Sequence, residues 1–296
     1  MSSSSSSSSE PITPRRSLLY MPGANSRALK KAQTLDCDSI IFDLEDAVAP
    51  TAKAEARSQV LNALALHDYG HRELVVRCNG LDTPWGLDDL QAFANAPIAA
   101  LLFPKIETTA QIDAIATALV ALDSALALWI MIETPTAVLD LRDLAQDERV
   151  ACLVMGTSDL VKELRANHTP KRENLGYALQ RCVMVARHAG KEIFDGVHLD
   201  FRNLESLREV CEVARAMGFD GKTLIHPQQI VIANEVFGYG SDAVVHAQEV
   251  LAAWESALAA GKGVAELNGQ LIENLHAEEA RRVVASAAAL KQRSGT

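Results

Sequence analysis

Residues 99–132 read AALLFPKIETTAQIDAIATALVALDSALALWIMI. Two apolar runs, Ala99–Phe103 and Ala127–Ile132, enclose a stretch rich in Ala and Leu whose polar residues recur at helical spacing. Neither run alternates polar and apolar residues, which is typical of parallel strands that are buried on both faces. The segment therefore predicts a strand, a helix and a second parallel strand.

The same alternation continues in both directions from this segment. Eight apolar runs occur in order, and they are Ser17–Tyr20, Ser39–Leu44, Leu74–Cys78, Ala99–Phe103, Ala127–Ile132, Ala151–Met155, Gly196–Leu199 and Lys222–Ile225. Helix-like stretches separate the runs, and Gly218 is placed to end one of these helices as a C′ glycine. Eight such repeats predict an α/β fold, the (β/α)8 TIM barrel. A doubly wound open sheet is the alternative, but no G-x-G-x-x-G follows the first run.

Residues beyond His226 exceed what a barrel requires. Three more helical stretches are expected at 227–236, 242–260 and 277–292, and Leu267-Asn268-Gly269-Gln270 predicts a hairpin or tight turn. We therefore expect a disordered Ser-rich tail at 1–13, the barrel at 14–236, and a C-terminal helical extension or lid at 237–296.

Composition excludes several classes of protein. The 296 residues are 48% hydrophobic, which is too many for a disordered chain, and the net charge of −10 disfavours nucleic acid and anionic lipid as partners. No apolar stretch approaches the roughly 20 residues that span a bilayer, and the N-terminus lacks the pattern of a signal peptide. Five scattered cysteines form no C-x-x-C pair, which disfavours disulfides and zinc. We expect a soluble, cytoplasmic protein.

Charged residues end most of the predicted strands, and a barrel would bring them onto one rim. Glu133 and Asp159 end neighbouring strands, and carboxylates that converge need a cation to compensate their charge. Mg²⁺ suits such a pair, because it takes few protein carboxylates and leaves positions for water and substrate. The alternative is that each is an ordinary loop acid or a helix N-cap, a role that Asp159 in particular would suit.

Two basic residues also close predicted strands. Arg77 at a strand end requires an anionic partner, which is either a protein carboxylate or a substrate carboxylate held by both arms of the guanidinium. Lys105 could form a Schiff base with a carbonyl substrate, but pairing with Glu107 or with an acid across the rim is the simpler interpretation if a metal is present.

Several short motifs, in this order and spacing, resemble those of one protein family. They are Arg15–Gly23 (RRSLLYMPG), Ile41–Val48 (IFDLEDAV), Arg77-Cys78-Asn79, Phe103-Pro104-Lys105, Ile132-Glu133-Thr134, Gly156–Leu160 (GTSDL), Gly218–Lys222 (GFDGK) and Ile225–Ile230 (IHPQQI). The chain resembles citrate lyase β-subunit-like proteins and malyl-CoA lyases, which are acyl-CoA lyases of the HpcH/HpaI aldolase superfamily. The resemblance covers roughly residues 14–292.

This resemblance implies a Mg²⁺-dependent carbon–carbon lyase that forms or cleaves a short hydroxyacyl-CoA of the malyl-CoA, citramalyl-CoA or citryl-CoA type. The partners would be an acyl-CoA and a small 2-oxoacid, and the assembly a homotrimer or hexamer. Carried over by position, the metal ligands would be Glu133 and Asp159, and the residues assigned to catalysis and substrate binding would be Arg77, Glu45, Asp46, Arg16, Gly156, Thr157 and Ser158. Glu45 and Asp46 would hold the metal's waters, and Arg16 would reach CoA.

One motif departs from the family pattern. The family carries a lid segment like Asp-Gly-x-Met-Ile-Asp-x-Pro, whose second Asp serves as acid or base, often from a neighbouring subunit. Here residues 268–275 read NGQLIENL, so Glu273 stands in place of that Asp. The longer side chain displaces the carboxylate by roughly 1.5 Å, which matters for positioned proton transfer. Three alternatives to the lyase therefore stay open: a malyl-CoA thioesterase or malate synthase-like hydrolase, an aldolase on free 2-oxoacids, and a weakly catalytic binding or assembly homologue.

Overall fold

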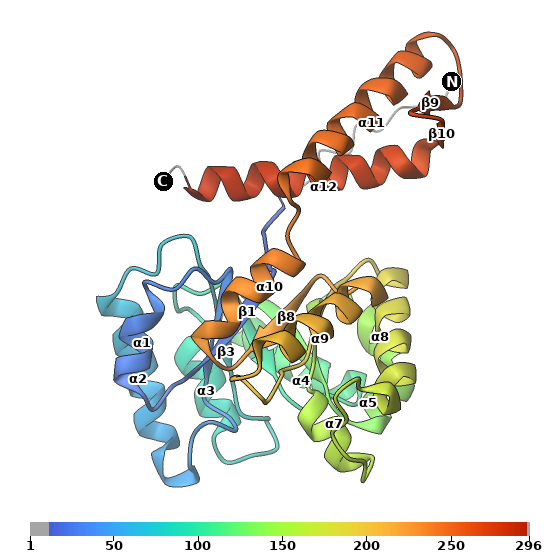
Figure 1. The fold of residues 1–296 in the computed structure, drawn as a ribbon. Helices are drawn as coiled ribbons and strands as arrows, with labels where there is room; N and C mark the ends of the chain where they lie inside the picture. Colours follow the sequence, from blue (N-terminus) through green and yellow to red (C-terminus); the bar gives the residue numbers. More distant parts are fainter. Residues whose placement is uncertain (1–11, 295–296) are drawn as a thin grey trace. The chain divides into compact units, whose positions relative to one another are not determined.

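The computed structural model describes residues 12–294, which fall into two compact units, 15–237 and 238–294, with residues 12–14 grouped with the second. Most of the predicted Ser-rich tail, residues 1–11, lies outside the described residues. Each unit has its own apolar core. Figure 1 labels many of the elements of both units.

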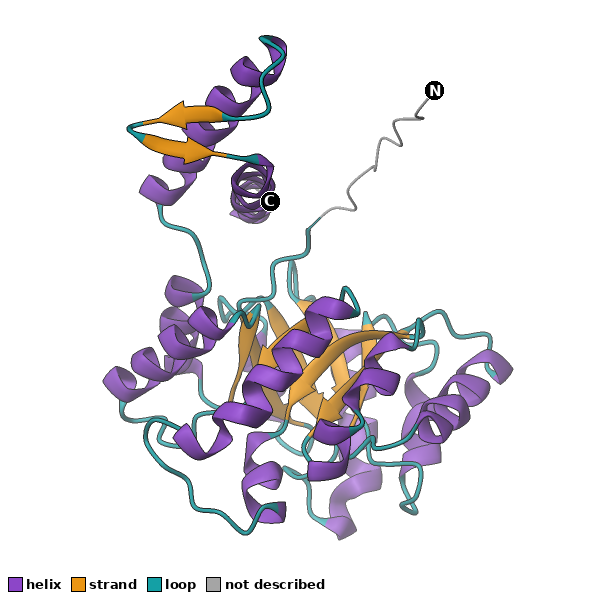
Figure 2. Ribbon diagram, turned by 90° about the vertical axis from the view of Figure 1, so that its right-hand side faces the viewer, coloured by secondary structure: helices purple, strands orange, loops and turns teal. Residues whose placement is uncertain are grey.

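Eight parallel strands form a closed barrel in the unit 15–237, each strand pairing with the next along the chain and β8 with β1. The strands are β1 (Ser17–Pro22), β2 (Ser39–Asp43), β3 (Glu73–Arg77), β4 (Ala100–Phe103), β5 (Ala127–Ile132), β6 (Val150–Met155), β7 (Glu192–Asp195) and β8 (Gly221–Leu224). Figure 2 shows these strands surrounded by the helices of the unit. The predicted (β/α)8 TIM barrel is confirmed.

Ten helices of the barrel unit pack around the strands. They are α1 (Ser26–Ala32), α2 (Lys53–Leu66), α3 (Gly86–Phe93), α4 (Thr109–Ala121), α5 (Pro135–Leu139), α6 (Leu141–Gln146), α7 (Thr157–Glu163), α8 (Gly176–His188), α9 (Leu204–Met217) and α10 (Ile230–Val236). Local sequence sets their ends: Thr108 and Gln111 form a capping box at the start of α4, and Gly218 ends α9 in the left-handed region with φ of 103°. Gly218 thus has the predicted role of a helix C-cap.

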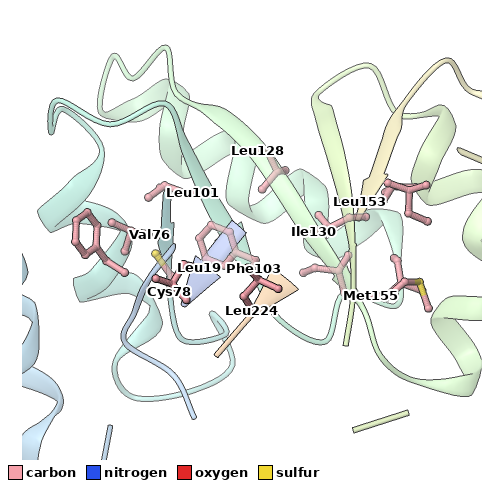
Figure 3. Packing of buried hydrophobic residues seen from close by; sticks show 14 of the residues in the cluster. Leu19, Val76, Cys78, Leu101, Phe103, Leu128, Ile130, Leu153, Met155 and Leu224 are labelled. Carbon is pink, nitrogen blue, oxygen red and sulfur yellow. The ribbon is translucent and has the colours of Figure 1, made fainter. Parts of the chain in front are cut away.

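Both faces of the strands are buried, which explains why the apolar runs do not alternate with polar residues. Alternate residues such as Leu18 and Trp129 belong to the cluster inside the barrel, whereas Leu19 and Ile130 belong to the larger cluster between strands and helices. Figure 3 shows part of this outer cluster. All five cysteines are free and buried within these layers, as expected for Cys78 and Cys152.

The predicted position of the seventh strand was wrong. We expected Gly196–Leu199, but β7 is Glu192–Asp195, and Gly196 follows it. The observed strand begins and ends with a carboxylate, and each is neutralised inside the fold: Glu192 by Arg15, and Asp195 by Lys222 among others. Because Glu192 and Asp195 are charged, a prediction that searches for apolar runs does not find this strand.

The unit 238–294 contains two helices and a hairpin. Helix α11 (Ser241–Ala259) leads to β9 (Ala265–Leu267) and β10 (Gln270–Ile272), and α12 (Asn274–Ser294) follows. Asn268 and Gly269 both have positive φ, as a two-residue hairpin turn requires, so the predicted turn is present. No helix within residues 12–294 is both long and apolar enough to cross a bilayer.

Candidate active site at the barrel mouth

A pocket of about 350 Å³ opens where the strands of the barrel end. It is lined by Tyr20, Pro22, Asp43, Asp46, Ala47, Arg77, Met131, Glu133, Met155, Gly156, Thr157, Ser158, Asp159, Val197, Thr223 and Ile225. Seven residues that the sequence singled out are among these, and they come from loops far apart in the chain. The closed barrel therefore brings together groups that strand-end position alone predicted to converge.

Glu133 is one of two deeply buried carboxylates of the pocket, and Asp43 is the other. Glu133 follows β5 directly, its residue is 2% exposed, and its Oε1 accepts a hydrogen bond of 2.8 Å from the backbone N–H of Lys105. Burial raises the pKa of Glu133 to about 7, although Lys105 and Arg77 act in the opposite direction. A carboxylate this deeply buried pays a large desolvation free energy when it is ionised, and a nearby cation offsets that penalty.

Gly156 makes room for Glu133. A Cβ at position 156 would lie 2.3 Å from Glu133 Oε2 and 2.5 Å from Glu133 Cβ. We therefore expect Gly156→Ala to displace the Glu133 side chain, to lower the free energy of unfolding by about 1–3 kcal/mol, and to weaken Mg²⁺ binding. Urea unfolding and metal titration measure both effects.

Gly176→Ala is the matched control, because nothing lies within 4 Å of a Cβ at that position. Gly176→Ala should leave metal binding unchanged. If Gly156→Ala bound Mg²⁺ as tightly as the unmodified protein, the close packing of Gly156 on Glu133 would be contradicted.

Asp159 lies in the first turn of α7, three residues after Gly156, which is the N-cap residue of that helix. Asp159 is therefore not the N-cap. Its Oδ2 lies 3.2 Å from Lys105 Nζ, and the same ammonium lies 2.9 Å from Glu45 Oε1. Lys105 thus contacts both Glu133, through its backbone, and Asp159, through its side chain. Lys105 therefore forms ion pairs with acids across the rim, as the simpler of its two interpretations predicted.

Arg77 is held by protein carboxylates. Its Nε and Nη2 donate to the two oxygens of Asp43 at 2.7 and 2.6 Å, and Nη1 lies 2.9 Å from Glu45 Oε2 and 3.5 Å from Asp46 Oδ2. The ring of Tyr20 packs on the guanidinium at 4.8 Å. Asp43 was not predicted as a site residue, although it precedes Leu44-Glu45-Asp46 at the end of β2. All three guanidinium nitrogens of Arg77 therefore contact protein carboxylates: Nε and Nη2 contact Asp43, and Nη1 contacts Glu45 and Asp46.

The donor set of the mouth suits one hard divalent ion. Among residues 12–294, no three His, Cys, Asp or Glu side chains are grouped so as to hold a metal by themselves. Mg²⁺ needs fewer, because it is commonly bound by one or two carboxylates together with water and substrate oxygens. Glu133 and Asp159 both line the pocket, and Glu133 is buried with a raised pKa. The residues present therefore fit Mg²⁺.

Three predicted site residues, Glu45, Arg16 and Glu273, are not among the residues that line this pocket. Arg16 precedes β1, so it belongs to the amino end of the barrel, where it donates to both oxygens of the buried Asp38 at 2.8–2.9 Å. Arg16 neutralises Asp38 in this structure, and its expected contact with CoA stays a prediction. Glu273 is an exposed residue of the unit 238–294, where its backbone N–H donates to His276 Nδ1 at 3.0 Å. The position of Glu273 relative to the pocket is not determined.

A buried ionic cluster behind the pocket was also missed from the sequence. Lys222 and Asp195 are both fully buried, with Nζ 2.6 Å from Oδ2, and Arg172 donates to Asp195 Oδ1 at 2.7 Å. Burial alone would raise the pKa of Asp195, but Lys222 and Arg172 hold it below its ordinary value. The Thr223 hydroxyl, which lines the pocket, donates to the Asp195 carbonyl at 3.0 Å. The cluster therefore supports one wall of the pocket.

Comparison with known proteins agrees with the geometry. Residues 16–227 match the HpcH/HpaI aldolase/citrate lyase family. A (3S)-malyl-CoA thioesterase of Cereibacter sphaeroides is 47% identical over 277 residues, which cover 94% of this chain and 96% of the relative. Citrate lyase subunit beta of Escherichia coli is 32% identical over 281 residues, 92% of this chain and 93% of that protein.

Solved structures agree as well. Protein CitE from Mycobacterium tuberculosis, crystallised with magnesium, acetoacetate and coenzyme A, has a TM-score of 0.74 at 25% identity, covering 97% of this chain and all (100%) of that one. A citrate lyase from Burkholderia xenovorans has a TM-score of 0.82 at 19% identity over 95% and 94% of the two chains, a likeness of fold alone. On the barrel, the residues of its mouth and these full-length matches, the chain belongs to the HpcH/HpaI aldolase/citrate lyase family.

Proposed function

We propose that this protein is a Mg²⁺-dependent enzyme that hydrolyses a short hydroxyacyl-CoA thioester of the malyl-CoA type. The observation that carries the proposal is the pocket in which the buried Glu133 and Asp159 face the same space as Arg77. The 47% identity to a malyl-CoA thioesterase over nearly the whole chain favours hydrolysis as the outcome.

Glu133 and Asp159 would hold the metal. When bound, Mg²⁺ would polarise substrate oxygens and stabilise negative charge that develops on them. Glu45, which contacts both Arg77 and Lys105, and Asp46, which is 64% exposed, would orient the water around the ion. Removing Mg²⁺ with a chelator should abolish turnover.

Arg77 would bind the anionic end of the substrate. Asp43 fixes the guanidinium through Nε and Nη2, and an incoming substrate carboxylate would replace Glu45 or the exposed Asp46 at Nη1. Gly156, Thr157 and Ser158 also line the pocket and would offer polar groups to the acyl oxygens. About 350 Å³ is enough for a four- or five-carbon acyl group, whereas the CoA nucleotide would stay outside.

In hydrolysis, water adds to the thioester carbonyl carbon, the carbon–sulfur bond breaks, and the CoA thiol leaves with a proton.

The second candidate is cleavage of the carbon–carbon bond of the same thioester into acyl-CoA and a 2-oxoacid. The relatives named citrate lyase subunit beta favour it, since they are 32% identical over more than nine-tenths of this chain. In that reaction Glu273 would protonate the departing enolate, from a lid of the same subunit or of a neighbour in a homotrimer or hexamer. The expectation of a cytoplasmic enzyme stays a prediction.

The product pattern distinguishes the two reactions. With malyl-CoA and Mg²⁺, we expect malate and free CoA in equal amounts, with neither acetyl-CoA nor glyoxylate, when products are separated by chromatography. Acetyl-CoA and glyoxylate in equal amounts would replace the hydrolase by the lyase. Aldol condensation or cleavage with free 2-oxoacids, without turnover of the thioester, would indicate an aldolase. No turnover of any of these substrates would favour a binding or assembly role.

A further inference from the structure

We infer that Lys105 competes with Mg²⁺ for the carboxylate of Asp159 and thereby sets the metal affinity of the mouth. The inference rests on the proposed function, because it takes Glu133 and Asp159 as the metal ligands. It goes further, because it assigns a role to a residue that is neither a ligand nor part of the pocket lining.

The backbone of Lys105 is fixed next to both carboxylates. Its N–H donates to Glu133 Oε1 at 2.8 Å, and its carbonyl accepts a hydrogen bond of 3.2 Å from Gln111 Nε2, the capping-box residue of α4. Lys105 also has φ of 52°, in the left-handed region that a non-glycine residue rarely adopts. A residue held in this unfavourable conformation at a site is constrained by its surroundings, so the start of its side chain has a defined direction.

The ammonium of Lys105 lies between two carboxylates. Nζ is 2.9 Å from Glu45 Oε1 and 3.2 Å from Asp159 Oδ2. Lys53 Nζ fixes the backbone beside Glu45 by donating to the Leu44 and Glu45 carbonyls at 2.8 and 2.6 Å, and Arg77 Nη1 holds the Glu45 carboxylate at 2.9 Å. Lys105 can therefore keep its partner Glu45 while it gives up Asp159.

Competition follows from charge and geometry. An ion that binds Asp159 either displaces Lys105 from Oδ2 or takes Oδ1 of the same carboxylate, and in both cases it lies close to the positive charge of Lys105, whose backbone is fixed. The Lys105 side chain is 47% exposed, so solvent screens this repulsion without removing it. Lys105 adds positive charge to a mouth that receives an anionic substrate. The same charge lowers the affinity of the site for Mg²⁺.

The test is a calorimetric titration of Mg²⁺ into chelator-treated full-length protein. Lys105→Met should bind Mg²⁺ roughly tenfold more tightly than the unmodified protein, because the competing charge is gone. Lys105→Asn should do the same, and asparagine tolerates the left-handed backbone, which guards against a folding defect in the Met variant. Lys105→Arg, which keeps the charge, should change the dissociation constant by less than about threefold.

Lys162→Met is the matched control. Lys162 also approaches Asp159, at 4.0 Å, but it is 72% exposed and lies on the surface of α7, so we expect less than a threefold change. Unchanged or weaker Mg²⁺ binding in both Lys105→Met and Lys105→Asn would overturn the inference. Mg²⁺ binding that survives in Glu133→Gln would instead contradict the metal assignment of the proposed function, so the two failures are distinguishable.

Discussion

Glu133→Gln is expected to lower kcat/KM for the thioester by about 10²- to 10³-fold or more, the range typical of lost electrostatic stabilisation at an active site. Gln keeps the shape of the side chain, and its amide oxygen can still accept the hydrogen bond from the Lys105 backbone. It removes the charge that would hold the metal. Initial rates at saturating Mg²⁺ measure the effect.

The fold should survive this change. Burial disfavours the ionised form of Glu133, whose pKa is about 7, so the neutral amide should leave the melting temperature unchanged or higher. Glu163→Gln is the matched control: Glu163 lies on the same helix as Asp159 but is 47% exposed and pairs only with Lys162 among the ion pairs of the described residues. Equal loss of activity in both variants, or none in Glu133→Gln, would contradict the assignment of Glu133 as a ligand.

The part of the site that sequence could predict is the part that follows apolar strands directly. Glu133 comes immediately after β5, and Asp159 follows β6 by four residues, so strand polarity alone puts both at the mouth. The same rule applies to Arg16. That residue precedes β1, and a residue before a strand lies at the amino end, whatever a family motif implies about its role.

The missed features all depend on pairs of charges that are far apart in the sequence. Asp43 is the last residue of β2 and Arg77 the last of β3, and the register of these strands sets them side by side. Nothing local marks Asp43 as the partner of Arg77, since Glu45 and Asp46 are equally acidic neighbours. Hydropathy failed at β7 for the same reason, because Asp195 looks like a loop residue until Lys222 on the paired strand neutralises it.

Asp195→Ala is expected to be the most destabilising single change at this cluster, lowering the free energy of unfolding by about 3–5 kcal/mol, the usual cost of stranding a buried charge. It would leave the ammonium of Lys222, whose residue is 0% exposed, without its carboxylate and with Arg172 as a positive neighbour. Burial already lowers the pKa of Lys222. Chemical unfolding followed by circular dichroism measures the loss.

Two further variants distinguish the effect of a buried unpaired charge on stability from the general effect of losing a carboxylate. Glu235→Ala removes the partner of Arg208 in an ion pair whose side chains are 53% and 40% exposed, so it should cost no more than about 1 kcal/mol. The double variant Asp195→Asn with Lys222→Met should recover part of the loss, because Met in place of Lys222 carries no desolvation cost and the Asn oxygen can still accept from Arg172. A loss in Asp195→Ala no larger than that in Glu235→Ala would mean that Lys222 finds another partner or sheds its proton. The buried pair would then position the Thr223 wall of the pocket without contributing to stability.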